Sequence, residues 1–338
     1  MDILIVIFFL IILMNIRIDK YGENDPLDIK YNKSIKGILA VLIIFSHIQY
    51  NRTDLSIFHL FNYIGDFLVG MFFFYSGYGL MIQSKKDGSY NKRLLKKRIL
   101  PLIEKYLIAN IIYLIYYVIV GEIFNYGSFL KFSENFNLLV SHSWYIIVII
   151  FLYCFFYLAG LLLKHNYRAE LIVITLLSFA CILVFGVLGI PVYWYNSILC
   201  FSFGIFIALN SKVIKEKNWL IFISSLICFT FLSYFQLKNN FDGKIKIYLV
   251  PIIKNISIII FCYCFNICSK YLNFKGDFFI KASKISLELY LYHGLFEKIY
   301  SNIIYIKDSN LLYGILVLIS TIIISIIMNT MFRKIKES

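Results

Sequence analysis

The stretch KGILAVLIIFSH, from Lys36 to His47, sets a cation and a histidine at the two ends of an apolar segment. Because the two residues are eleven apart, they project from one face of an α-helix. A rise of about 1.5 Å per residue separates them by about 16 Å along the axis. If Lys36 lies at a membrane surface, His47 lies near the middle of a hydrocarbon core about 30 Å thick. An ionisable side chain at that depth either packs by hydrogen bonding to a neighbouring helix or marks a functional site. The functional interpretation is favoured, because burying an ionisable group in a membrane costs free energy.

Composition places the whole chain in a membrane. Of its 338 residues, 60% are hydrophobic and 15% are charged, and the mean hydropathy is +0.78. The formal net charge is +14, but the lysines and arginines gather in short segments between apolar ones, as they do in cytoplasmic loops. We expect no nucleic-acid partner, because no basic helix stands clear of the membrane. Membrane lipid is the expected surrounding.

The predicted fold is all-α, a polytopic transmembrane helix bundle with ten core spans and one extra N-terminal span. We expect an added anchor at 1–16, a cytoplasmic linker at 17–33, the membrane domain at 34–332 and a cytoplasmic tail at 333–338. Basic connections at every second position put the C-terminus in the cytoplasm. The ten core spans are expected at 34–50, 61–82, 100–120, 143–163, 170–190, 193–209, 219–235, 247–268, 285–303 and 311–332.

A strongly basic loop is expected between residues 85 and 98. Such a segment either binds anionic lipid and orients the protein, or holds the phosphates of a cytosolic cosubstrate. Arg93 and Arg98 are the candidates for phosphate, because a guanidinium donates a fork of hydrogen bonds. Lys36 also has two interpretations. A lysine at a helix end commonly extends to the interface, whereas the face shared with His47 favours a role in the site.

Other polar side chains stand out in apolar surroundings. They are Ser76, Trp144, Glu288, Tyr292 and His293. A tryptophan beside a span is typical of an aromatic belt. His293 and Glu297 are four apart and share a helix face, so they form either a structural hydrogen bond or part of a site. We expect no metal, because no group of residues has metal-ligand spacing.

Taken in order, these segments resemble the acyltransferase 3 family, integral membrane proteins that transfer acyl groups, commonly acetyl, to sugars and other acceptors at the cell envelope. The stretch from Lys36 to His47 is similar to the family's R-G-x-A opening with a histidine eleven residues after the arginine. FFFYSGY at 72–78 is similar to F-F-x-x-S-G-[FY], and RILP at 98–101 to the R-x-x-P end of the basic loop. SWY at 143–145 is similar to the W-[FY] span, and LYH at 291–293 to the Y-L-x-H segment. Lysine replaces the family's arginine at 36, and Leu95 stands where a second arginine often precedes Arg98.

The resemblance implies a membrane-bound O-acyltransferase of the bacterial plasma membrane. It would move acetyl from acetyl-CoA to a hydroxyl of a cell-surface polysaccharide, such as a capsule or exopolysaccharide, or of a lipid-linked glycan. Lys36, Arg98 and Arg93 would hold the cosubstrate's phosphates. His47 would act as base on the acceptor hydroxyl or briefly carry the acyl group. The candidates for acceptor binding are Ser76, Trp144, Tyr292, His293 and Glu288.

A polytopic exporter or flippase of an envelope glycan is the alternative. Such a protein also has many spans with sparse intramembrane charge. It would spread polar residues along several helices in both halves of the chain. Here the polar groups concentrate near the second, third and tenth of the eleven expected spans, counted with the N-terminal anchor, which favours the enzyme.

Overall fold

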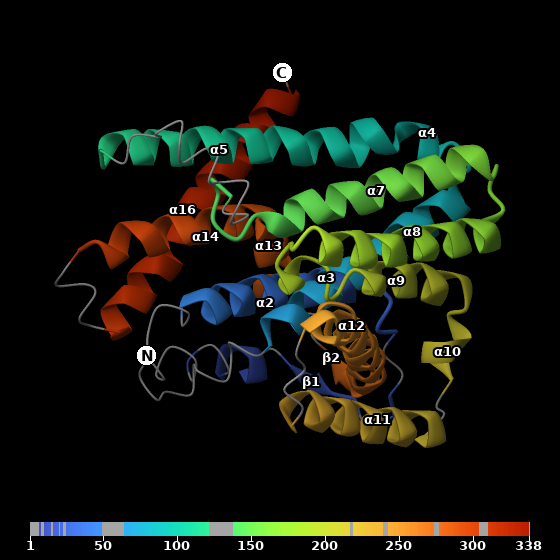
Figure 1. Ribbon diagram of the computed structural model, residues 1–338. Coiled ribbons are helices and arrows are strands. Elements are labelled where there is room, and N and C mark those ends of the chain that lie inside the picture. Colours follow the sequence, from blue (N-terminus) through green and yellow to red (C-terminus); the bar gives the residue numbers. More distant parts are fainter. Residues whose placement is uncertain are drawn as a thin grey trace.

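The computed structural model is a helix bundle (Figure 1). It describes residues 7, 10–14, 16–19, 21–22, 25–48, 64–121, 138–216, 219–238, 243–273, 277–303 and 310–337. The all-α prediction is confirmed, and the strand pairing in the described ranges is limited to β1 (Arg17–Ile18) against β2 (Leu272–Asn273). Seven helices there are long and apolar enough to cross a membrane. The count of ten spans stays a prediction, as does the anchor at 1–16, which lies mostly outside the described residues.

The helix that carries the opening stretch is α2 (Ile29–Ile48). It begins before residue 34, where the first core span was expected, because Asp28 accepts a hydrogen bond from the backbone N–H of Tyr31 (3.2 Å) and so caps the first turn. Short helix α13 (Asp277–Lys284) packs against it. A Cβ at Gly37 would collide with the backbone carbonyl of Phe279, so the glycine after Lys36 permits this close approach.

Helix α3 (Gly65–Lys86) crosses α9 (Leu199–Leu209) at a contact made by two glycines. A Cβ at Gly77 would strike the carbonyl of Phe201, and one at Gly204 would strike the carbonyl of Phe74. The backbones therefore touch, as small residues allow in membrane helices. The glycine of the FFFYSGY segment thus has a packing role.

The span expected at 193–209 is helical only in part. It consists of the short helix η3 (Val192–Trp194), a buried irregular segment and then α9. Asn255, on α12 (Gly243–Cys268), satisfies this backbone by donating to the carbonyl of Tyr195 (2.8 Å) and accepting from the N–H of Leu199 (2.9 Å). Irregular backbone at membrane depth requires such partners.

The basic loop expected between residues 85 and 98 is wrong, since most of it is helix. Residues from Tyr90 to Ile119 form one helix of 30 residues, built from α4 (Tyr90–Leu94), the π-helical turn η2 (Leu95–Ile99) and α5 (Leu100–Ile119). Pro101 lacks a backbone N–H and so cannot donate the usual helical hydrogen bond. The π-helical turn just before it is wider than an α-helical turn and accommodates the proline without ending the helix. The basic side chains therefore stand on a rigid element that continues into a candidate span.

The remaining helices surround this arrangement. They are α7 (Trp144–Leu162), α8 (Tyr167–Val187), α10 (Lys212–Lys215), α11 (Trp219–Lys238), η4 (Ser269–Tyr271), α14 (Ser286–Ser301) and α16 (Asn310–Glu337). Helix α14 contacts α2, α5 and α16, so it lies inside the bundle. Its central position brings its polar residues to the residues on α2.

Candidate active site

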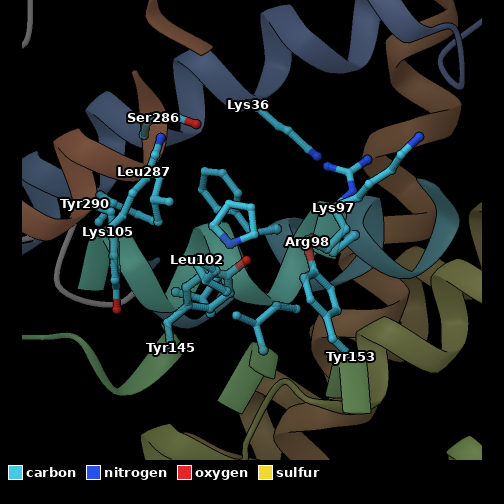
Figure 2. A pocket seen from close by; sticks show the side chains of 17 residues that line it. Lys36, Lys97, Arg98, Leu102, Lys105, Tyr145, Tyr153, Ser286, Leu287 and Tyr290 are labelled. Atoms are coloured by element: carbon cyan, nitrogen blue, oxygen red, sulfur yellow. The ribbon is translucent and has the colours of Figure 1, made fainter. Parts of the chain in front are cut away.

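A pocket of about 320 Å³ opens between α2, α3, the α4–η2–α5 helix, α7 and α14 (Figure 2). Helix α2 lines it with Lys36, Ala40 and Ile43, which lie on the face predicted from the sequence. Ligand sites span roughly 300–1,000 Å³. A pocket at the small end of that range accommodates a small molecule or one arm of a larger one.

One end of the pocket is cationic. Figure 2 shows the side chains of Lys36, Lys97 and Arg98 gathered there, the first from α2 and the other two from η2. Arg98 Nε donates a hydrogen bond to the hydroxyl of Tyr90 (3.1 Å), which fixes the guanidinium. No carboxylate within the described ranges pairs with these three cations. The arrangement suits a ligand with several negative charges.

Two of these cations were expected together and one was missed. The sequence paired Lys36 with Arg98, and the structure brings both to the pocket. Lys97 was not singled out, because it is one of several lysines in a basic run and only the helical geometry shows which of them reach the edge of the pocket.

Arg93 does not line the pocket. It is exposed and forms an ion pair with Asp87 and a hydrogen bond to the hydroxyl of Ser89 (3.1 Å). Hydrogen bonds from Ser89 lower the pKa of the Asp87 carboxyl, which therefore stays ionised beside Arg93. The expected partnership of Arg93 with Arg98 has no support in this placement.

The opposite end of the pocket is formed by aromatic side chains and a neutralised lysine. Tyr145 and Tyr290 lie there with ring centroids 5.4 Å apart, and Lys105 makes an ion pair with Glu288. The buried carboxylate of Glu288 also accepts a hydrogen bond from Asn329 (3.2 Å). Glu288 therefore holds Lys105 and does not itself line the pocket.

Of the other four expected acceptor-binding residues, three lie outside the pocket, namely Trp144, Tyr292 and His293, and one lines it. Ser76 lines the pocket beside Tyr145. Trp144 is buried against Tyr193, with ring centroids 5.7 Å apart, and does not reach the pocket. Tyr292 is fully buried, and its hydroxyl has no hydrogen-bond partner in the part of the chain that the structure describes.

Beyond the aromatic end lies a cluster of three histidines, His47, His142 and His293, which we call the histidine cluster. The ring centroid of His47 is 3.8 Å from that of His142 and 5.1 Å from that of His293. His47 is one turn past Ile43 on the lining face of α2, and Tyr290 connects the pocket to the cluster, its ring 5.8 Å from that of His293. The cluster therefore continues the line that starts at Lys36.

Each of the two partners of His47 is held by a second group. His142 Nε2 lies 3.3 Å from Oε2 of the buried Glu297, and His293 Nδ1 lies 3.2 Å from the carbonyl of Leu289. His142 was missed from the sequence as a site residue, although it stands directly before the SWY segment. Its partners come from α2 and α14, and no local spacing reveals a contact of that kind.

The histidine cluster is also the place where a metal could bind. One ring nitrogen from each of the three histidines lies within 4.8 Å of the other two. Zinc–nitrogen bonds of about 2.0–2.1 Å would require the rings to move closer together. The sequence led us to expect no metal, and a cluster assembled from three separate segments leaves no signature in sequence spacing.

Comparison with known proteins gives one match. A family model described as an acyltransferase domain, Acyl_transf_3, matches residues 30–330. No curated protein and no solved structure matches the chain. The matched range contains the whole pocket and the histidine cluster.

Proposed function

Because the chain belongs to the Acyl_transf_3 family of membrane acyltransferases, we propose that it transfers acetyl from cytosolic acetyl-CoA to a hydroxyl of a cell-surface polysaccharide or lipid-linked glycan. The observation that carries the proposal is the single line along α2, from a cationic end through a pocket to a histidine. Acetyl-CoA has phosphates at one end and a thioester at the other, so its phosphates would match the cations and its thioester would match the histidine.

The cationic end holds the phosphates of acetyl-CoA. Lys36, Lys97 and Arg98 supply the positive charge, and the Arg98 guanidinium can donate two parallel hydrogen bonds. The pocket is too small for the whole donor and takes its thioester arm, whose acetyl end points to Tyr145 and Tyr290. Lys105 adds no net charge there, since Glu288 pairs with it.

His47 receives the reactive end of the donor. It either takes the proton from the acceptor hydroxyl or forms a transient acyl-imidazole, and both roles need a neutral imidazole next to the thioester. Its position between the pocket and His142 supports both.

The acceptor reaches the histidine cluster from the side opposite the donor pocket. Buried polar atoms at the cluster lack partners among the described residues, namely His293 Nε2 and Oε1 of Glu297, the carboxylate that pairs with His142. Unsatisfied buried groups are costly, and hydroxyls of a sugar would satisfy them. With the basic segments in the cytoplasm, the donor enters from the cytosol, the acceptor from the external side, and the C-terminus is cytoplasmic in a bacterial plasma membrane.

Glycan export is the second candidate. A transporter needs polar contacts along a path through two halves of the bundle. Here Lys36, Lys97 and Arg98 gather at one pocket and three histidines gather in one cluster beside it, which favours a single reaction site.

Acetyl-CoA binding to the purified protein in lipid nanodiscs tests the donor site. We expect Arg98→Ala to weaken binding by about tenfold or more, because a charge-assisted contact of about 1.4 kcal/mol or more is lost. Arg93→Ala is the matched control and should change affinity less than twofold, since Arg93 lies outside the pocket. Equal losses in both variants would contradict the donor site. Absent binding with intact glycan transport would support the exporter.

The same preparation tests His47. His47→Ala should bind acetyl-CoA normally and lose acetyl transfer by about 100-fold or more, as expected for removal of a catalytic base or nucleophile. Mass spectrometry of surface glycans from cells carrying each variant provides the readout. A folded His47→Ala protein that acetylates its glycan at the wild-type rate would overturn the assignment.

A further inference from the structure

The three histidines of the cluster differ in what holds them. His142 pairs with the carboxylate of Glu297, and His293 is bound to a backbone carbonyl. His47 makes no hydrogen bond to any residue that the structure describes. An imidazole oriented by a carboxylate is the usual arrangement of a general base, because the carboxylate fixes the tautomer and stabilises the imidazolium. By this criterion His142 is the base of the cluster.

The two rings also face different sides of the site. His47 follows Ile43 on the helix face that lines the donor pocket. His142 precedes α7 and belongs to the segment that joins α5 to α7, at the end opposite the basic residues. A donor in the pocket therefore meets His47, and an acceptor from the other side meets His142.

The backbone of His142 is held in a strained conformation. Its φ is +62°, in the left-handed region that side chains seldom adopt. The Tyr290 hydroxyl donates a hydrogen bond to the His142 carbonyl. Gly294 leaves room for the side chains of this segment, because a Cβ there would lie 2.7 Å from Cβ of Ser141 and 3.3 Å from Cδ2 of His142. A strained backbone conformation that several surrounding contacts hold in place is typical of functional sites.

We propose that His47 carries the acyl group as an acyl-imidazole and that His142, oriented by Glu297, is the base that takes the proton from the acceptor hydroxyl. This division of labour rests on the proposed acetyl transfer. His142 touches the reacting hydroxyl and is a catalytic residue, whereas Glu297 acts through His142 and is a positioning residue.

The two steps balance. A nitrogen of neutral His47 attacks the thioester carbonyl, the C–S bond breaks, and the departing thiolate takes the ring N–H proton to leave as the free thiol. The acceptor oxygen then attacks the acyl carbon, the C–N bond breaks, and the hydroxyl proton passes to His142. His142 returns that proton to His47, which restores both neutral rings. One nitrogen from each ring lies within 4.8 Å of the others, a separation that one bridging water spans for these proton transfers.

Trapping the acyl-enzyme tests the division. The protein in nanodiscs is mixed with acetyl-CoA and a glycan acceptor, quenched rapidly and measured by intact-protein mass spectrometry. His142→Asn removes the base, and asparagine tolerates a positive φ. We expect its transfer to fall by about 100-fold or more, while an acetylated form accumulates that hydroxylamine releases. Glu297→Gln should accumulate the same species, and Glu297→Asp should restore part of the transfer.

Two controls separate this inference from a general loss of folding. His165→Asn changes an exposed histidine with a φ of +69° outside the site and should leave transfer unchanged. Adding His47→Ala to His142→Asn should abolish the acetylated form.

Wild-type transfer in His142→Asn, with His47→Ala inactive, would overturn this inference alone. Zinc retained at one ion per chain, with activity lost on chelation, would also overturn it, since a coordinated imidazole has no free lone pair. Absent acetyl-CoA binding in the wild type would instead overturn the proposed function.

Discussion

Helices α14 and α8 use the membrane in opposite ways. Helix α14 has 16 residues and buries Glu288, His293 and Glu297, whereas α8 has 21 residues and exposes large apolar side chains such as Leu176 (64%) and Val187 (71%). Helix α8 is long and apolar enough to cross a membrane, whereas α14 and α2 are not, although the sequence predicted spans at 285–303 and 34–50. The difference teaches that an outward-facing helix such as α8 carries the strong apolar signal, whereas α2 and α14, which carry His47 and His293, hold their polar residues because they pack against other helices.

The largest effect is expected from breaking the ion pair between Lys105 on α5 and Glu288 on α14. Lys105→Met leaves the buried carboxylate of Glu288 without its cation, which should destabilise the protein by about 3–5 kcal/mol. Thermal unfolding in nanodiscs measures the loss. Adding Glu288→Gln removes the stranded charge and should recover most of the stability. A single variant as stable as the wild type would show that water or lipid headgroups already solvate this pair.

A charge on the lipid-facing side of α8 should cost slightly less. Leu176→Asp places a carboxylate near the centre of the helix, at an insertion cost of about 2.5–3.5 kcal/mol. Carbonate extraction of membranes should show a smaller integrated fraction. Leu176→Phe at the same position should integrate normally. If both variants integrate equally, Leu176 faces protein and the contrast with α14 is lost.

The smallest change in stability is expected from alanine substitutions on two faces of α3. Gly77→Ala pushes a methyl group into the backbone of α9 and should cost about 1–3 kcal/mol. Gly79→Ala meets nothing within 4 Å and should be neutral or stabilising by up to about 1 kcal/mol, because alanine restricts the unfolded chain. Thermal midpoints of the two variants that coincide would refute the close α3–α9 crossing.

Local regularity explains what the sequence could predict. The spacing of Lys36 and His47 placed both on one face of α2, and the apolar runs located most helices, since both follow from the helical repeat. The basic loop predicted between residues 85 and 98 was wrong, because a π-helical turn just before Pro101 lets α4 continue into α5. His142 and the pairing of Lys105 with Glu288 could not be predicted, because they depend on how distant helices pack.

The long helix from Tyr90 to Ile119 has a mechanical consequence. At about 1.5 Å per residue its 30 residues extend about 45 Å, which exceeds a hydrocarbon core of about 30 Å by roughly half. One end carries Lys97 and Arg98, and the same rod continues as the pocket wall at Leu102 and Lys105. If the chain uses the proposed donor, this rigid helix fixes the distance between the cations that would bind its phosphates and the pocket wall at Leu102 and Lys105. A donor with a longer or shorter arm would then place its acyl group at the wrong depth.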